Sequence, residues 1–118
     1  MNYRYCTSAV ASIAMTAGKL GGTELHGHDV TVRVCVDIDR VIDIELLREI
    51  TGEAVRAYDH TNLDESIGHG ALIEDLLAEI RGRVIASLKS RGIEARVVTV
   101  EGSIPSGTII LLSDNGSG

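Results

Sequence analysis

The sequence has very few aromatic residues. It contains no Phe or Trp, and Tyr3, Tyr5 and Tyr58 are its only tyrosines. A nucleic-acid-binding chain usually offers a basic surface and aromatic rings on which bases stack. This chain has a formal net charge of −6, and its 11 Lys and Arg residues form no cluster. The composition therefore argues against a nucleic-acid partner, and it predicts a core built from Val, Ile, Leu and Ala.

Long apolar runs, proline and cysteine motifs are also scarce. The N-terminal run "AVASIAM" is too short to span a bilayer, so we expect no membrane segment. The two cysteines, Cys6 and Cys35, form no Cys-x-x-Cys pair, so we expect no disulfide framework, a reducing compartment and a cytoplasmic protein. The 118 residues predict a single domain, 1–118, with a frayed tail over 113–118.

The clearest pattern present is a strict alternation in "TELHGHDVTVRVCVDID". On a strand, His26 and His28 share a face with the branched residues Val30, Val32, Val34, Val36 and Ile38. Two imidazoles at this spacing stand roughly 6 to 7 Å apart at their roots, close enough to bind one metal ion. The alternative is a pair of half-exposed histidines at a strand start, hydrogen-bonded to neighbouring backbone.

The remaining segments complete an order of two strands, two helices and two strands. A first strand is expected over 3–14, a second over 26–39, and a helix in "VIDIELLREITGEAVRAY" with Asp43 as its N-cap. A polar connector, "DHTNLDESIGHG", precedes a second helix that stops at Gly92, and "IEARVVTVEGS" and "SGTIILLSD" are the last strands. This order predicts an α+β fold, a four-stranded antiparallel sheet with two helices packed on one face. Its two open edges favour assembly into a closed homo-oligomeric barrel.

Five strings in this order resemble the 6-pyruvoyl-tetrahydropterin synthase and 6-carboxy-tetrahydropterin synthase (QueD-like) family. They are "LHGHDVTVRV", "VIDIELL", "DHTNLDE", "ALIEDLLAEI" and "VVTVEGS". The resemblance covers nearly the whole chain. It implies the ββααββ tunnelling fold (T-fold), a pterin-like small-molecule substrate and a trimer-based hexamer. It also implies bound zinc, with His26 and His28 as two of its ligands.

The resemblance assigns further roles to three residues. Glu101 matches the family's pterin anchor, and a carboxylate can accept two parallel N–H bonds from the guanidine-like edge of a pterin. Asp59 and His60 resemble the family's Asp-His pair that assists proton transfer, a task that suits imidazole. Without the motifs, Glu101 reads as a solvated strand end, and Asp59 and His60 as a helix cap and an exposed ring.

The chain departs from the family at several positions. The third zinc-binding histidine aligns with Met15, a weak zinc ligand that we expect to fill apolar space. His69 or a carboxylate remains a candidate for the missing ligand. The family's catalytic cysteine aligns with Gly22, and Glu24 is the nearest acid. Leu72 stands where the family has a threonine that contacts substrate.

These changes leave two main functions open. The first is an enzyme acting on a dihydroneopterin-type substrate with lyase or aldolase-like chemistry, in which His60 is the base and Glu101 the anchor. The second is a non-catalytic pterin- or purine-binding paralogue that kept half of the site. A purely structural oligomer would need neither residue.

Overall fold

The computed structural model describes residues 1–114 of the chain. In chain order its elements are β1 (Tyr3–Met15), the 3-10 turn η1 (Gly18–Leu20), β2 (His26–Ile38), α1 (Ile44–Arg56), β3 (Thr61–Asn62), α2 (Leu63–Ser66), α3 (Ile73–Ser90), β4 (Arg96–Ser103) and β5 (Ile109–Ser113). The predicted order of two strands, two long helices and two strands is confirmed.

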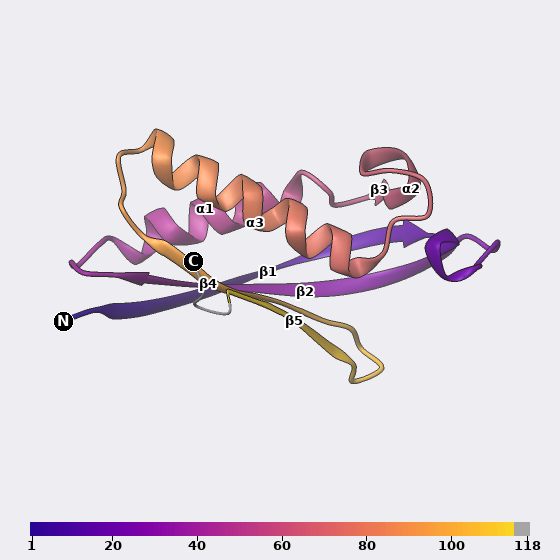
Figure 1. Cartoon of the computed structure of the whole chain (residues 1–118), viewed down its shortest axis with the longest axis horizontal. Coiled ribbons are helices and arrows are strands. Elements are labelled where there is room, and N and C mark those ends of the chain that lie inside the picture. The colour runs from indigo at the N-terminus through magenta and orange to yellow at the C-terminus, as the bar shows by residue number, and fades with distance from the viewer. Residues whose placement is uncertain (115–118) are drawn as a thin grey trace.

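The strands form one sheet in the order β3-β1-β2-β4-β5, and α1 and α3 lie together on one of its faces (Figure 1). β1 and β2 pair antiparallel over their whole length, from Tyr3 opposite Ile38 to Met15 opposite His26. The predicted α+β fold is confirmed, with one difference. The polar connector adds the short strand β3, which pairs parallel to β1 at Ile13 and Ala14, and it also adds α2.

The core lies between the sheet and the two long helices. As the alternation predicts, the even-numbered residues of β2 from Val30 to Val36 are fully buried. The helices contribute Leu47, Ile50, Leu76, Leu77, Ile80 and Val84, each at most 1% exposed. With no Phe or Trp available, aliphatic side chains fill this layer. We call the opposite side of the sheet, which carries the odd-numbered residues of β2, the helix-free face.

Local signals set the ends of the long helices. Asp43 caps α1 as predicted, because its carboxylate accepts a hydrogen bond of 2.9 Å from the backbone N–H of Glu45. Leu72 is the N-cap of α3 and has no acceptor of its own. Asp75 compensates by accepting the backbone N–H of Leu72 at 2.8 Å. The stop at Gly92 is also confirmed, since this residue has a left-handed φ of 68°.

The structure contains a disulfide, although the sequence predicts no disulfide framework. Cys6 lies directly opposite Cys35 in the β1–β2 register, and the two form a disulfide. Their separation of 29 positions shows no local motif, so only the strand register brings the sulfurs together. Because the two cysteines are paired, cysteine usage no longer supports the expected reducing compartment.

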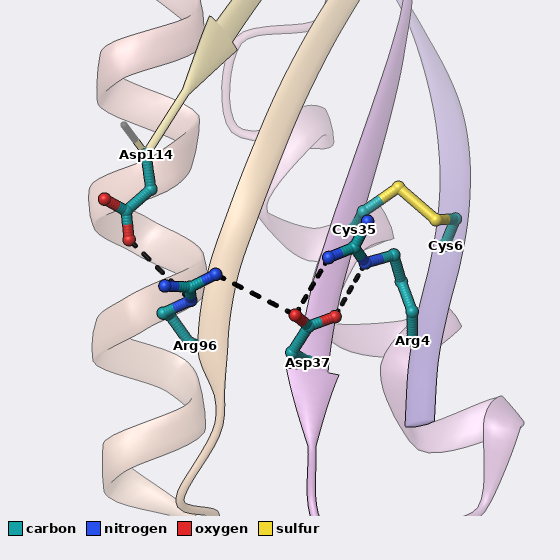
Figure 2. A network of polar contacts seen from close by, with 6 residues as sticks. All are labelled: Arg4, Cys6, Cys35, Asp37, Arg96 and Asp114. Carbon is teal, nitrogen blue, oxygen red and sulfur yellow. Dashed lines mark hydrogen bonds and ion pairs between the residues drawn. A yellow bond between two sulfur atoms is a disulfide. The ribbon is translucent and has the colours of Figure 1, made fainter. Parts of the chain in front are cut away.

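A row of alternating charges lies next to the disulfide on the helix-free face (Figure 2). Arg4 makes a bidentate contact with Asp37, with nitrogen–oxygen distances of 2.7 and 2.9 Å. Arg96 lies 3.9 Å from Asp37 and 3.8 Å from Asp114. The Arg4 guanidinium holds the pKa of the Asp37 carboxyl below its usual value. This row joins β1, β2, β4 and the end of β5.

The end of the described chain differs from the predicted tail over 113–118. Ser113 is the last residue of β5 and pairs with Thr99, and the backbone N–H of Asp114 donates to the Val98 carbonyl at 2.9 Å. Residues 115–118 of the predicted tail lie outside the described residues. Among residues 1–114, no helix combines the length and the apolar character that crossing a membrane requires.

Candidate functional site

Met15, His26 and His28 come together on the helix-facing side of the sheet, where β1 ends and β2 begins. Met15 pairs with His26 in the ladder and Ile13 pairs with His28, so all three side chains lie on one face. The two imidazole rings are 5.0 Å apart in an edge-to-face arrangement. His26 is exposed, and its Nδ1 lies 3.1 Å from the Glu24 carbonyl oxygen. The strand register therefore places Met15 beside the two histidines. This is the position at which the family resemblance implies a third zinc ligand.

The donors present do not fit a three-histidine zinc site. Met15 is only 5% exposed and belongs to the apolar core, as predicted. Over residues 1–114, no group of three or more His, Cys, Asp or Glu side chains is arranged to hold a metal ion. His69 and Glu24, the candidate replacements, are both exposed. Two imidazoles and a thioether are a weak donor set for zinc.

Glu24 lies in an open cleft at the same end of the sheet. The cleft is lined by the loop between β1 and β2, including Thr16, Gly22 and Glu24, and by His26. Gly22, the position of the family's catalytic cysteine, thus shares one cleft with the nearest acid and one of the two histidines. The structure brings these three predicted positions together.

Asp59 and His60 sit on the outer edge of β1. The Asp59 carboxylate accepts the backbone N–H of Ser12 at 2.8 Å, and the N–H of His60 donates to the Ser12 carbonyl at 2.7 Å. These bonds hold His60 in a left-handed conformation with φ of 59°. Its ring is 82% exposed, and Nε2 is 3.5 Å from the Asp59 carboxylate. The pair therefore presents an imidazole to solvent beside a carboxylate, on the β1 edge away from β2.

Glu101 lies on the helix-free face. It is half-buried on β4, where it pairs with Arg33 of β2 and with Leu111 of β5. Glu101 lies on the side of β4 opposite Val100, because Val100 pairs with the core residue Val34 and Glu101 pairs with the next residue in the ladder, Arg33. Because His26 and His28 point to the helix-facing side, a single chain does not bring Glu101 and the two histidines to one face of the sheet.

Leu72 and Asp64 lie near the same end of the sheet, but their contacts are with other parts of the fold and serve its structure. Leu72 is half-buried and packs against the core. Asp64, which sequence reasoning missed, accepts three hydrogen bonds: from the backbone N–H of Thr16 at 3.0 Å, from the Thr16 hydroxyl at 2.9 Å and from the N–H of Gly70 at 2.7 Å. The Gly70 bond is the main cause of its lowered pKa. Asp64 thus ties the loop after β1 to the loop before α3.

Comparisons with known proteins identify the fold. No protein-family model matches the chain, and no curated protein matches it. Among solved structures, the chain is similar to Caenorhabditis elegans 6-pyruvoyl tetrahydropterin synthase, with a TM-score of 0.74 and 16% identity over 98% of this chain and 97% of that one.

Two Plasmodium structures of 6-pyruvoyl tetrahydropterin synthase are also similar. The P. falciparum protein has a TM-score of 0.57 and 18% identity, over 96% of this chain and 99% of that one. A P. vivax variant, in which cysteine replaces a glutamate described as a catalytic residue, has a TM-score of 0.59 and 17% identity, over 97% and 99% of the two chains. Over nearly its full length, this chain therefore has the fold of the 6-pyruvoyl tetrahydropterin synthase structures, as the sequence resemblance implies.

Proposed function

We propose that the protein is a tetrahydropterin synthase-like lyase that binds a pterin-type small molecule and acts on the side chain of a dihydroneopterin-type substrate. The observation that carries this proposal is the match of fold to 6-pyruvoyl tetrahydropterin synthase over nearly the full length of both chains. The five sequence strings that resemble the family support it, since they occur along this chain in the order that the resemblance implies.

Glu101 is the proposed anchor for the heterocycle. Its carboxylate is half-buried at one end of β4, and no hydrogen bond or ion pair to another described side chain occupies it. Two parallel N–H groups of a pterin would give it two charge-assisted hydrogen bonds. Because Glu101 and the histidines lie on opposite faces of one sheet, we propose that a complete site forms between copies of the chain. A trimer-based hexamer is the proposed assembly.

His60, Asp59 and Glu24 are the proposed groups for proton transfer. Imidazole can accept a proton and return it near neutral pH, and Asp59 lies beside the His60 ring to orient it and to offset its charge when it is protonated. Glu24 is proposed as the second acid–base group, in the place of the family's cysteine. The glutamate described as catalytic in the P. vivax protein supports a carboxylate in that role.

The packing of Met15 favours a second function, non-catalytic binding of a pterin or purine. The Met15 side chain is packed into the core beside His26, so this chain lacks the third imidazole that would complete a family-type zinc site. A binding protein would need Glu101 but would need neither the zinc nor the proton-transfer groups.

Binding and turnover measured on the same preparation separate these functions. Calorimetry with neopterin reports binding, and chromatography with mass spectrometry of dihydroneopterin-type substrates reports side-chain products, with and without added zinc. Products that disappear in His60→Ala, while binding persists, support the enzyme. Binding without products supports the binding protein, and the absence of both rejects the proposal.

A further inference from the structure

The Cys6–Cys35 disulfide lies on the helix-free face of the sheet, away from α1 and α3 (Figure 2). The exposures of its two halves differ. Cys6 is exposed, whereas Cys35 is buried, with only 7% of its surface exposed. A thiolate breaks a disulfide by attacking one sulfur along the axis of the bond, so the more accessible sulfur is the one attacked. This difference in exposure points to Cys6.

Charged pairs flank the disulfide on both sides. Two residues away along the strands, Arg4 and Asp37 form a close ion pair. Two residues away in the other direction, Arg33 lies opposite Glu101. Each pair is neutral in sum, so neither sulfur sits in a strongly positive environment that would select it as a thiolate. Access, rather than charge, therefore distinguishes Cys6 from Cys35.

We propose that Cys6 and Cys35 form a reversible dithiol–disulfide couple in the folded protein, with the Cys6 sulfur as the site of exchange with a dithiol reductant. A thiolate of the reductant attacks Cys6 Sγ, a mixed disulfide forms, and Cys35 leaves as a thiolate that takes up a proton. The second thiolate of the reductant then attacks the reductant sulfur of the mixed disulfide. The bond to Cys6 Sγ breaks, and Cys6 leaves as a thiolate that also takes up a proton. Two electrons pass to the protein, and the reductant becomes a disulfide.

The couple controls how firmly β1 and β2 are held together next to Glu101. Cys35 pairs with Thr99 on β4, two residues before Glu101, and the β2–β4 ladder has an irregularity between Cys35 and Val36. A ladder is locally weaker at such a bulge. The crosslink restrains the strand pair at this point, and its reduction releases that restraint. This inference does not depend on the identity of the ligand.

Native reduction tests the couple directly. The full chain is treated with dithiothreitol without denaturant, quenched in acid, unfolded and alkylated, and then weighed by mass spectrometry. We expect two alkyl groups per chain after native treatment and none in the untreated protein. If the groups appear only when guanidinium accompanies the reductant, the disulfide is a structural crosslink and the proposal is overturned.

Two matched variants test the role of Cys6. Cys35→Ser leaves Cys6 as the single thiol, and Cys6→Ser leaves Cys35. We expect Cys6 to react with oxidised glutathione at least about tenfold faster than Cys35, because it is the more exposed cysteine. Circular dichroism checks that both variants fold. Equal rates, or faster reaction at Cys35, would overturn the assignment of the exchange sulfur.

Hydrogen exchange measured on wild-type protein tests the restraint without any substitution. Reduction should speed amide exchange in peptides from β1, β2 and β4 around the disulfide, and it should leave peptides from α3 unchanged. Identical exchange in the oxidised and reduced forms would show that the crosslink does not restrain the strands.

Discussion

Met15 lies directly opposite His26 in the ladder between β1 and β2, on the same side of the sheet. A thioether therefore occupies the position from which a third imidazole would reach the two histidines. The Met15 side chain is nevertheless packed into the core. The strand register thus places a residue at the right position, but this residue offers no imidazole nitrogen to a metal ion.

Restoring the third imidazole should increase zinc binding. The unmodified protein is expected to carry less than one zinc per chain, and Met15→His should raise occupancy and give tetrahedral coordination by three histidines and water. Metal analysis after dialysis measures occupancy, and X-ray absorption reports the coordination. Val10→His, on the helix-free face of β1, is the control and should bring no gain. Stoichiometric zinc in the unmodified protein would show that another residue completes the site.

Replacing the proposed anchor should abolish ligand binding while the fold is kept. Glu101→Ala removes both charge-assisted hydrogen bonds to a pterin and takes nothing from the core, so calorimetry with neopterin should show no binding. Glu74→Ala changes an exposed glutamate on α3 and should bind as the unmodified protein does. An unchanged affinity for Glu101→Ala would reject the pterin assignment.

The protein should form a stable oligomer. β3 covers β1 at only two positions, and β5 lies at the other edge of the sheet, so edge-to-edge pairing would satisfy backbone groups that otherwise face solvent. Light scattering should give a mass that is a multiple of three chains. A 12.6 kDa species that persists at micromolar concentration would contradict this.

Asp64→Asn should lower stability above the ordinary pKa of an aspartate. The three donors from Thr16 and Gly70 stabilise the charged carboxylate, which lowers its pKa in the folded state from the ordinary value of 3.8. The stabilisation of the fold by the Asp64 carboxylate is therefore fully present above pH 3.8. It is lost as the pH falls through the lowered pKa of Asp64 in the folded state. Melting curves of wild type and variant should differ at neutral pH and converge in strong acid. Asp39→Asn, at an exposed position, should leave the melting temperature unchanged at neutral pH.

The parts of the fold that local patterns determine could be predicted from the sequence. Alternation identified β2 almost to the residue, and the side chain of Asp43 correctly marked the start of α1. The face occupied by Glu101 also follows from alternation. In each case, the decisive interaction lies within the same element or next to it.

The missed features depend on partners far away in the sequence. Asp64 binds Thr16 across 48 positions, and Cys6 meets Cys35 only through the register of two long strands. β3 forms because Asp59 and His60 bind the backbone of Ser12 and draw the connector against β1. Glu101 and the histidines lie on opposite faces of the sheet, and this separation also follows from strand pairing between distant segments.

The disulfide also shapes the unfolded chain. The segment between Cys6 and Cys35 contains Met15, Gly22, Glu24, His26 and His28, so the crosslink closes a loop around the two histidines and the cleft beside them. A closed loop of this length lowers the entropy of the denatured ensemble by an amount worth about 4 kcal/mol at 25 °C in the chain-entropy model. In the oxidised protein the two long strands never separate fully, and denaturation leaves this hairpin region as a tethered ring rather than a free coil.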